Sequence, residues 1–268
     1  STDAGFGTIT LDEQTSALQR VFTGKPFATY YYRVRGINDH GAGEWSATIS
    51  PQFQGYSDDF SDVNSGWPRK VYYHHVEGDD IPVFDVNYEN GSYRAKIMLN
   101  TDSFNNYSMG VVRAPWVNTM SEYEVQVDHR FARAGDQAAS PTSGKGGLIF
   151  GANDNYSTIY VVEWNYEGDC AVTRYENLGS TVVDVRFADS HFYKNWGRCS
   201  SLTTGYDKHN LVKVVVDGNR ATVTINGSYI DSFTDSGLSS ARRVGLMAGS
   251  WERTPVENRF DDFSVIAR

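Results

Sequence analysis

Three carboxylates follow one another along a single segment at spacings that suit acid–base chemistry. Glu124 lies two positions after Glu122, and Asp128 lies four positions after Glu124, so on a β-strand their side chains would point to the same face. Two carboxylates roughly 5 to 10 Å apart are what hydrolysis of a glycosidic bond needs. The residues between them include tyrosine and valine, however, and this alternation is equally typical of a strand with one face in solvent. We therefore expect no catalytic residues here.

Other catalytic patterns are missing from the sequence. There is no Gly-x-Ser-x-Gly nucleophile motif and no Gly-x-x-x-x-Gly-Lys phosphate-binding loop. The two cysteines, Cys170 and Cys199, lack the spacing of a zinc site. One disulfide between them is the favoured interpretation, because it fits an oxidising compartment. Two free thiols are the alternative.

Aromatic and polar side chains gather between residues 164 and 206, where they could bind sugar. Pyranose rings stack on Trp and Tyr through their C–H faces, while Asn, Asp and Arg bind the hydroxyl groups. Residues 191–198 are expected to form a loop, which a disulfide could hold from beneath. The candidate ligand-binding residues are Trp164, Tyr166, Arg174, Tyr175, Tyr193 and Trp196, together with Trp251 outside this segment. The alternative is that these rings cap the core or fill an interface between subunits.

Composition describes a folded protein with an acidic surface. Of the 268 residues, 40% are hydrophobic, 14% are aromatic and 21% are charged, which is enough apolar material for a core. The net charge of −9 argues against a nucleic-acid partner, because such binding depends on clustered Lys and Arg. No stretch approaches the ~20 apolar residues that span a bilayer. The chain begins Ser1-Thr2-Asp3, so we expect a processed product that is extracellular or at the cell surface.

The elements that must position these residues are β-strands. Short runs of Val, Ile, Thr, Tyr and Phe alternate with Gly, Asn and Asp, and helix signals are nearly absent. The clearest hairpin spans residues 214–228, where Asp217-Gly218 and Asn226-Gly227 are pairs that tolerate the positive φ of tight turns. The predicted fold class is all-β.

An aromatic pattern near the amino terminus predicts a strand, a turn and a strand. Residues 29–37 alternate between two faces, residues 38–41 form an Asn- and Gly-containing turn, and Trp45-Ser46 follows. This pattern resembles the end of a fibronectin type III domain, which needs seven strands. Residues 1–50 would supply only the later strands, including residues 7–11 and 17–23. Either the chain is a fragment of a longer polypeptide, or another chain supplies the missing strands.

A second domain is expected from residue 58 to residue 268, after a linker over residues 51–57. Asp58-Asp59-Phe60 near its beginning is echoed by Asp261-Asp262-Phe263 near its end. First and last strands often pair side by side in sandwich domains. We therefore expect Phe60 and Phe263 in the core and the carboxylates at the rim.

Several short motifs carry a family resemblance across roughly residues 57–268. In order, they are Asn210-Leu211-Val212-Lys213-Val214, Val223-Thr224-Ile225-Asn226-Gly227, Val244-Gly245-Leu246 and Phe260-Asp261-Asp262-Phe263. They resemble the concanavalin A-like or laminin-G-like superfamily, which implies a jelly-roll β-sandwich. Some members are glycoside hydrolases, but the Glu-x-Asp-x-x-Glu spacing of the bacterial glucanases is absent here. Because one fold hosts many activities, the resemblance bears on fold more than on function.

A structural calcium ion is the cofactor that the resemblance suggests. Jelly-roll binding modules often hold one with carboxylate and carbonyl oxygens. Asp58, Asp59, Asp261 and Asp262 would converge if the terminal strands pair. The alternative is a set of solvated turn residues. Asn-x-Ser sequons occur at Asn90, Asn106, Asn155 and Asn226, where chance occurrence is the favoured interpretation.

The sequence therefore predicts a secreted or cell-surface binding or adhesion module without catalytic activity. Its expected partner is a polysaccharide or another component of the extracellular matrix, and the fibronectin-like part would act as a spacer. One alternative is a structural subunit of an extracellular filament, in which strand exchange between subunits builds a homopolymer. The other alternative is a glycoside hydrolase.

Overall fold

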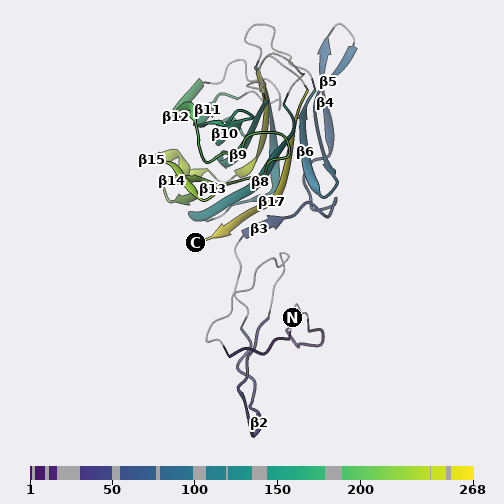
Figure 1. Ribbon diagram of the computed structural model, residues 1–268, viewed down its shortest axis with the longest axis vertical. Coiled ribbons are helices and arrows are strands. Elements are labelled where there is room, and N and C mark those ends of the chain that lie inside the picture. The colour runs from purple at the N-terminus through teal and green to yellow at the C-terminus, as the bar shows by residue number, and fades with distance from the viewer. Residues whose placement is uncertain are drawn as a thin grey trace. The chain divides into compact units, whose positions relative to one another are not determined.

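The chain divides into two compact units, Ser1–Gln54 and Gly55–Arg268 (Figure 1). A computed structural model describes residues 1, 4–9, 12–16, 31–49, 55–76, 79–98, 107–118, 120–134, 144–178, 189–241, 243–251 and 255–268. Within these residues every long element is a strand, and one short 3₁₀ segment covers Ser236–Ser240. The all-β prediction is confirmed. The structure contains no helix, among its described residues, that is long and apolar enough to cross a bilayer.

The first unit is described mainly by one hairpin. Strands β1 (Ile37–Asn38) and β2 (Gly41–Ala42) pair antiparallel, and Tyr32 bridges to Ile49 further along the two arms. The Asn38 side chain accepts the His40 amide at 2.9 Å, which closes the predicted turn. Residues 7–9 form no strand, contrary to expectation, and residues 17–23 lie outside the described part. The described residues do not establish a fibronectin type III fold, so that resemblance stays a prediction.

The second unit is built from two antiparallel sheets. The smaller has the order β12-β11-β10-β9-β16-β7 among the described strands. Their bounds are β7 Tyr107–Val117, β9 Gly144–Ala152, β10 Ile159–Asn165, β11 Asp169–Glu176, β12 Asp189–Arg198 and β16 Arg243–Trp251. We refer to it as the six-stranded sheet.

The larger sheet has the order β15-β14-β13-β8-β17-β6-β5-β4, and β3 also pairs with β17. Its strands are β3 Gly55–Asp58, β4 Lys70–Val76, β5 Asp79–Glu89, β6 Ser92–Ile97, β8 Glu122–Ala134, β13 Asn210–Asp217, β14 Arg220–Ile225, β15 Ser228–Thr234 and β17 Val256–Ala267. We refer to it as the nine-stranded sheet. Because β3 begins at Gly55, residues 55–57 are strand and not the expected linker.

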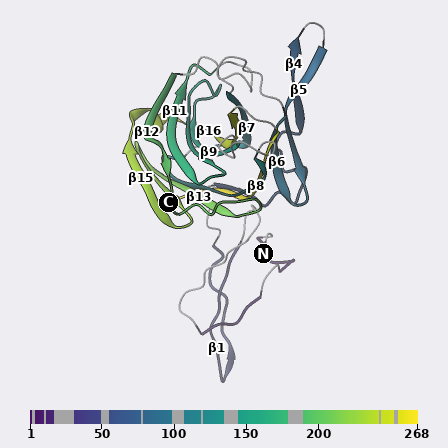
Figure 2. The ribbon, with the colours of Figure 1, turned by 45° about the horizontal axis from the view of Figure 1, so that its top comes forward.

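The core lies between the two sheets, which form separate layers (Figure 2). Alternate residues of each strand point into it: Val212, Val214 and Val216 of β13 are buried, whereas Leu211 is exposed. Large aromatic side chains fill much of the space, including Phe60, Tyr93, Phe150 and Phe260. The predicted hairpin is confirmed, since Asp217 pairs with Arg220 across its first turn.

The terminal strands pair as the Asp-Asp-Phe echo predicted. In the register of β17 and β3, Phe263 lies opposite Asp58, and both Phe60 and Phe263 are buried in the core. The first half of β17 pairs with β6, the second half pairs with β3, and β8 runs along its other side. A bulge interrupts the β8 pairing between Asp261 and Ser264.

Residues 191–198 form most of β12 and are not the expected loop. This strand lies at the edge of the six-stranded sheet and pairs only with β11 among the described strands. Its register shifts twice, on either side of the Val172–Lys194 pair. Such bulges break the alternation of apolar and polar residues, which is why the sequence reads as a loop.

Candidate functional site

The predicted disulfide between Cys170 and Cys199 is present, with the two Cα atoms 5.8 Å apart. It joins the second residue of β11 to the residue that follows β12. The backbone amide of Cys199 also donates to the carbonyl oxygen of Gly168 at 2.9 Å. Both cysteines are buried. The disulfide therefore fixes the β10–β11 turn against the segment that leaves β12.

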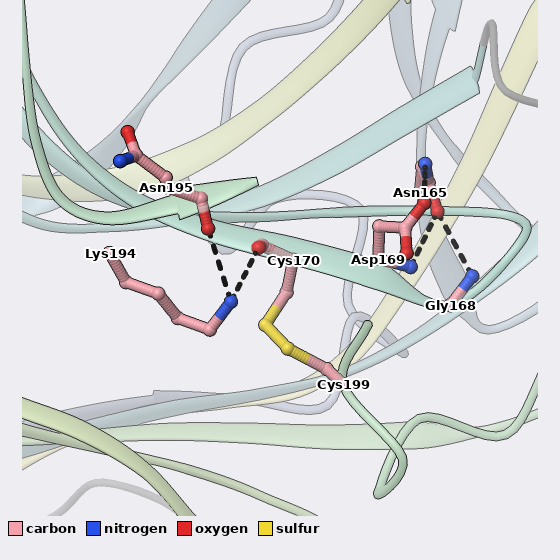
Figure 3. Close-up of a disulfide and its surroundings, with 7 residues drawn as sticks. All are labelled: Asn165, Gly168, Asp169, Cys170, Lys194, Asn195 and Cys199. Atoms are coloured by element: carbon pink, nitrogen blue, oxygen red, sulfur yellow. Dashed lines mark hydrogen bonds between the residues drawn. A yellow bond between two sulfur atoms is a disulfide. The ribbon is translucent and has the colours of Figure 1, made fainter. Parts of the chain in front are cut away.

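The β10–β11 turn is held by the side chain of Asn165 (Figure 3). Its Oδ1 accepts the backbone amides of Gly168 at 2.9 Å and Asp169 at 2.8 Å. Gly168 has a φ of +97°, and a Cβ atom there would lie 2.7 Å from the Thr204 side chain. Only glycine meets both demands without strain. The turn is thus locked in one conformation.

Two tyrosine rings lie at this fixed end of the sandwich, and we call Tyr166 and Tyr206 the tyrosine platform. Their centroids are 4.6 Å apart with an interplanar angle of 43°. Tyr206 is 46% exposed, and Tyr166 is half-buried with its ring 6.1 Å from that of Phe131. The Asp207 amide donates to the Phe131 carbonyl at 2.9 Å. Both rings are therefore supported from beneath while part of their surface faces solvent.

Polar side chains flank the platform. Arg198 donates to the carbonyl oxygen of Glu167 in the turn, and Arg198 itself is exposed. Asp207, which follows Tyr206 in the sequence, forms an ion pair with Arg130 at 2.7 Å. Guanidinium and carboxylate groups beside an aromatic face are the groups that orient sugar hydroxyls.

Sequence reasoning identified Tyr166 but missed Tyr206. Tyr206 follows Cys199 by seven residues. It comes directly after the segment Leu202-Thr203-Thr204-Gly205, which leads away from the disulfide. The position of the second cysteine is therefore the signal that could have led to it.

Trp164 is part of the core and is not available to a ligand. It is 0% exposed, and its indole N–H donates to Nδ1 of His129 at 2.8 Å. The other ring nitrogen of His129 lies 2.7 Å from Oδ1 of Asn258. Burial lowers the pKa of His129 to about 3, so the ring is neutral. The prediction that Trp164 binds ligand is wrong, because its side chain points into the core between the two sheets.

Arg174 and Tyr193 also point inward, where they close one edge of the sandwich. The Tyr193 ring stacks on Phe233 of β15, with centroids 3.8 Å apart, and its hydroxyl donates to Asp235. Arg174 pairs with the same carboxylate at 2.5 Å. Burial raises the pKa of Tyr193. These contacts agree with the alternative that the rings cap the core.

Tyr175 and Trp196 belong to a different group on the outer face of the six-stranded sheet. We call this group, Lys145, Glu163, Thr173, Tyr175 and Trp196, the outer cluster. Tyr175 is buried and donates to Oε1 of Glu163 at 2.8 Å. The Nζ atom of Lys145 lies 4.3 Å from the centroid of the Trp196 ring, and Trp196 is half-buried. Tyr175 is therefore not the exposed ring that was expected. The side chain of Trp251, at the end of β16, lies outside the described part.

The three carboxylates of β8 lie on the outer face of the nine-stranded sheet. The intervening residues Val125 and Val127 are buried in the core, so the carboxylates point away from it. Glu124 forms an ion pair with Lys213 at 2.7 Å, and Asp128 pairs with His209 at 2.8 Å. Two of the three carboxylates, Glu124 and Asp128, are thus paired with basic side chains.

The terminal aspartates accept hydrogen bonds from nearby residues. Oδ1 of Asp58 accepts the Phe60 amide at 2.7 Å, and its other oxygen accepts the hydroxyl groups of Tyr56 and Ser65. Asp59 accepts from Ser61, and Asp261 from the Asp262 amide. No group of three or more His, Cys, Asp or Glu residues in the described part is placed to hold a metal ion. These residues fit turn closure better than coordination, and calcium binding stays a prediction.

The sequons differ in their surroundings. The Asn226 side-chain amide donates to the Ser201 carbonyl at 2.8 Å and to Asn210 at 2.9 Å, so it is committed to local structure. Asn90 and Asn155 are exposed. Asn106 lies outside the described residues.

Comparison with known proteins yields only distant similarity. No family model and no curated protein matches the sequence. Among solved structures, the chain is similar to the carbohydrate binding module CBM66 from Bacillus subtilis, with 11% identity, a TM-score of 0.38, and coverage of 76% of this chain and 96% of that chain. It is also similar to a glycoside hydrolase family 16 endo-glucanase from Bacteroides ovatus, with 8% identity, a TM-score of 0.49, and coverage of 78% and 98%. A third similar structure is the catalytic domain of an endo-1,3-beta-glucanase from Thermotoga petrophila, with 9% identity, a TM-score of 0.48, and coverage of 80% and 98%. Similarity at this level does not decide a function.

Proposed function

We propose that this protein binds carbohydrate through the tyrosine platform without cleaving it. The observation that carries the proposal is the pair of angled rings, with Tyr166 on a turn fixed by a disulfide and Tyr206 in the segment that follows Cys199. Sugar C–H faces stack on such rings. Because both rings are already held in place, binding costs little conformational entropy.

The flanking groups suit binding better than hydrolysis. A glycoside hydrolase needs a second carboxyl group that stays protonated as a general acid, and such groups owe this state to burial. Asp207 is exposed and paired with Arg130 at 2.7 Å. Asp207 and Arg130 are therefore suited to hydrogen bonding with hydroxyl groups.

The proposal includes an extracellular location. A disulfide persists in an oxidising environment and is rare in the cytosol. The buried Cys170–Cys199 bond holds the platform, so binding would depend on such an environment. A polysaccharide of the cell surface or matrix is the partner that fits this location.

Binding to immobilised polysaccharides tests the proposal with a matched pair of variants. Tyr206→Ala removes the exposed ring of the platform. Tyr229→Ala removes a ring that is 65% exposed on β15, a strand of the nine-stranded sheet. We expect Tyr206→Ala to weaken binding by about fivefold or more, since stacking of one ring on a sugar is worth roughly 1 kcal/mol or more. Tyr229→Ala should bind as the unaltered chain does. Equal affinity of all three proteins would exclude the platform.

A hydrolase is the second candidate, and Glu163 is the observation that favours it. This carboxylate is buried on the outer face of the six-stranded sheet and accepts a hydrogen bond from Tyr175. A carboxyl group beside the scissile bond is one of the two that glycoside hydrolysis requires. Release of reducing ends from a polysaccharide, abolished by Glu163→Gln, would establish this candidate. No release from any polysaccharide that the protein binds would leave binding as its function.

A further inference from the structure

A lysine, a glutamate and an asparagine lie together on the outer face of the six-stranded sheet, almost closed to solvent. Lys145 and Asn165 are each 7% exposed, and Glu163 is 0% exposed. Around them this face is apolar, with Ile149, Val161 and Met247 buried. Removing an amine and a carboxylate from water costs several kcal/mol each before their mutual attraction is counted. Charged groups kept in such a place often have a chemical role.

Strand register brings the three residues to one point. Lys145 of β9 pairs directly with Asn165 of β10, and directly opposed residues have Cβ atoms about 5 Å apart. Glu163 precedes Asn165 by two residues in the same strand, so both point to the same face. The amine, the amide and the carboxylate are therefore neighbours.

The direction of the Lys145 side chain is fixed by Trp196. The sheet order is β12-β11-β10-β9, so a lysine of β9 meets a tryptophan of β12 only by extending across β10. Its Nζ lies 4.3 Å from the Trp196 ring centroid. The side chain thus passes over the strand that carries Asn165 and Glu163.

The side-chain carbonyl of Asn165 is polarised. Its Oδ1 accepts two backbone N–H groups, from Gly168 at 2.9 Å and Asp169 at 2.8 Å (Figure 3). Two such donors stabilise the negative charge that forms on a carbonyl oxygen when a nucleophile attacks its carbon. Cγ of Asn165 is therefore activated as an electrophile.

We propose that Lys145 and Asn165 become joined by an intramolecular amide bond, with Glu163 transferring the proton. The neutral amine of Lys145 attacks Cγ of Asn165 and forms the Nζ–Cγ bond. Glu163 accepts a proton from Nζ and delivers it to Nδ2. The Cγ–Nδ2 bond then breaks and ammonia leaves, so that the reaction needs no oxidant and no cofactor.

Two further features support this chemistry. Burial lowers the pKa of Lys145, which increases the neutral, nucleophilic fraction of its amine. The hydroxyl group of Tyr175 donates to Oε1 of Glu163 at 2.8 Å. This hydrogen bond orients the carboxylate beside the reacting atoms.

The mass of the intact, unreduced chain tests the proposal directly. We expect it to be lower than the mass of the sequence by two hydrogens for the disulfide and by one ammonia for the crosslink. After tryptic digestion the chain should remain uncut at Lys145. A branched peptide should join the segment around Lys145 to the segment around Asn165.

Three variants separate the crosslink from a structural role of the same residues. Lys145→Arg removes the nucleophile and Glu163→Gln removes the proton carrier, and both should retain the ammonia. Lys194→Arg is the control: Lys194 donates to the Cys170 carbonyl at 3.0 Å in the same sheet, and this variant should still lose ammonia.

A wild-type mass lower by two hydrogens alone would overturn the proposal. So would a loss of ammonia without the branched peptide, because an Asn-Gly pair such as Asn90-Gly91 can lose ammonia by closing on its own backbone. If Glu163→Gln does not fold, the wild-type mass and the peptide map of Lys194→Arg still decide.

Discussion

His129 connects three polar groups inside the apolar core. It accepts a hydrogen bond from Trp164, its second nitrogen lies 2.7 Å from Asn258, and Asn258 donates to the backbone carbonyl of Lys145 at 3.1 Å. Because Nδ1 accepts from the indole, the proton of the neutral ring is on Nε2 and is donated to Asn258. A network this complete stabilises the core only while the histidine stays neutral.

The stability of the protein should therefore fall in mild acid. The pKa of His129 is about 3 in the folded chain, against an ordinary value of 6.5. Below pH 6.5 His129 binds a proton in the unfolded chain but stays neutral in the folded chain. This costs about 1.4 kcal/mol of unfolding free energy per pH unit until the pH approaches 3.

Urea unfolding at pH 7 and pH 5 measures this effect. We expect the chain to lose about 2 kcal/mol from this residue over that interval, and His129→Gln to lack that part of the loss. His40→Gln is the control, because the exposed His40 belongs to the first unit and is not part of this core network. A His129→Gln chain with the same pH dependence as the wild type would contradict the neutral ring.

Gly168 should be intolerant of any side chain. Gly168→Ala would place a Cβ 2.7 Å from Thr204 and 3.0 Å from Arg198, at a φ of +97°. We expect a loss of about 1 to 3 kcal/mol in unfolding free energy, together with weaker carbohydrate binding. Gly197→Ala is the matched control, since nothing lies within 4 Å of a Cβ there. Equal stability of the two variants would contradict the locked turn.

Sequence reasoning located the region of the candidate site better than its residues. Residue type identified Tyr166 and Trp196, which are partly accessible. It could not separate them from Trp164 and Tyr175, which are buried. Burial depends on which face of a strand a residue occupies and on what covers that face, and a single residue type does not encode either.

At the scale of elements, the disulfide is a link between neighbouring strands. Cys170 lies opposite Gly197 in the β11–β12 register, and the bond closes a segment of 29 residues. In the loop-entropy description a crosslink of this length stabilises a fold by about 3 to 4 kcal/mol. β12 is an edge strand with one paired neighbour among the described strands, so it depends on this link more than a central strand would.

Replacement of both cysteines by alanine should expose that dependence. We expect a loss of about 3 to 4 kcal/mol in the free energy of unfolding and a weaker affinity for carbohydrate, since the turn under Tyr166 loses its anchor. Urea unfolding and binding, each compared with the unreduced wild type, measure the two effects. An unchanged affinity would mean that the hydrogen bonds of Asn165 hold the platform without the disulfide.

The elements that were predicted correctly carry local signals. The β13–β14 hairpin has a Gly at its turn with a φ of +57°, and the strands on either side alternate cleanly. Pairing of β3 with β17 was predictable from the repeated Asp-Asp-Phe. β12 was missed because its two register shifts remove the period of two on which strand recognition depends.

At the scale of the whole molecule, the second unit should fold without the first. Among the described residues its buried core extends from Phe60 to Val265, and Gly55–Arg268 forms a compact unit of its own. The hairpin of the first unit presents apolar side chains to solvent, with Val34 72% exposed. An apolar side chain that stays in solvent contributes no burial of apolar surface to the stability of the protein.

A chain covering Gly55–Arg268 should therefore unfold at the same temperature as the full chain. Calorimetry of both proteins checks this, and a lower transition for the shorter chain would show that the first unit stabilises the sandwich. Light scattering on the same samples tests assembly. Self-association of the full chain alone would support the homopolymer alternative and assign it to the first unit.

Strand β17 has a consequence for the order of events during synthesis. It is the last of the described strands along the chain, yet it lies in the middle of the nine-stranded sheet, between β8 on one side and β6 and β3 on the other. A ribosome adds about 5 to 20 residues each second, so β8 and β6 wait several seconds with open edges before β17 emerges. Open strand edges pair readily with other chains. The nascent protein is thus most vulnerable to aggregation in the interval before its final strand enters the sheet.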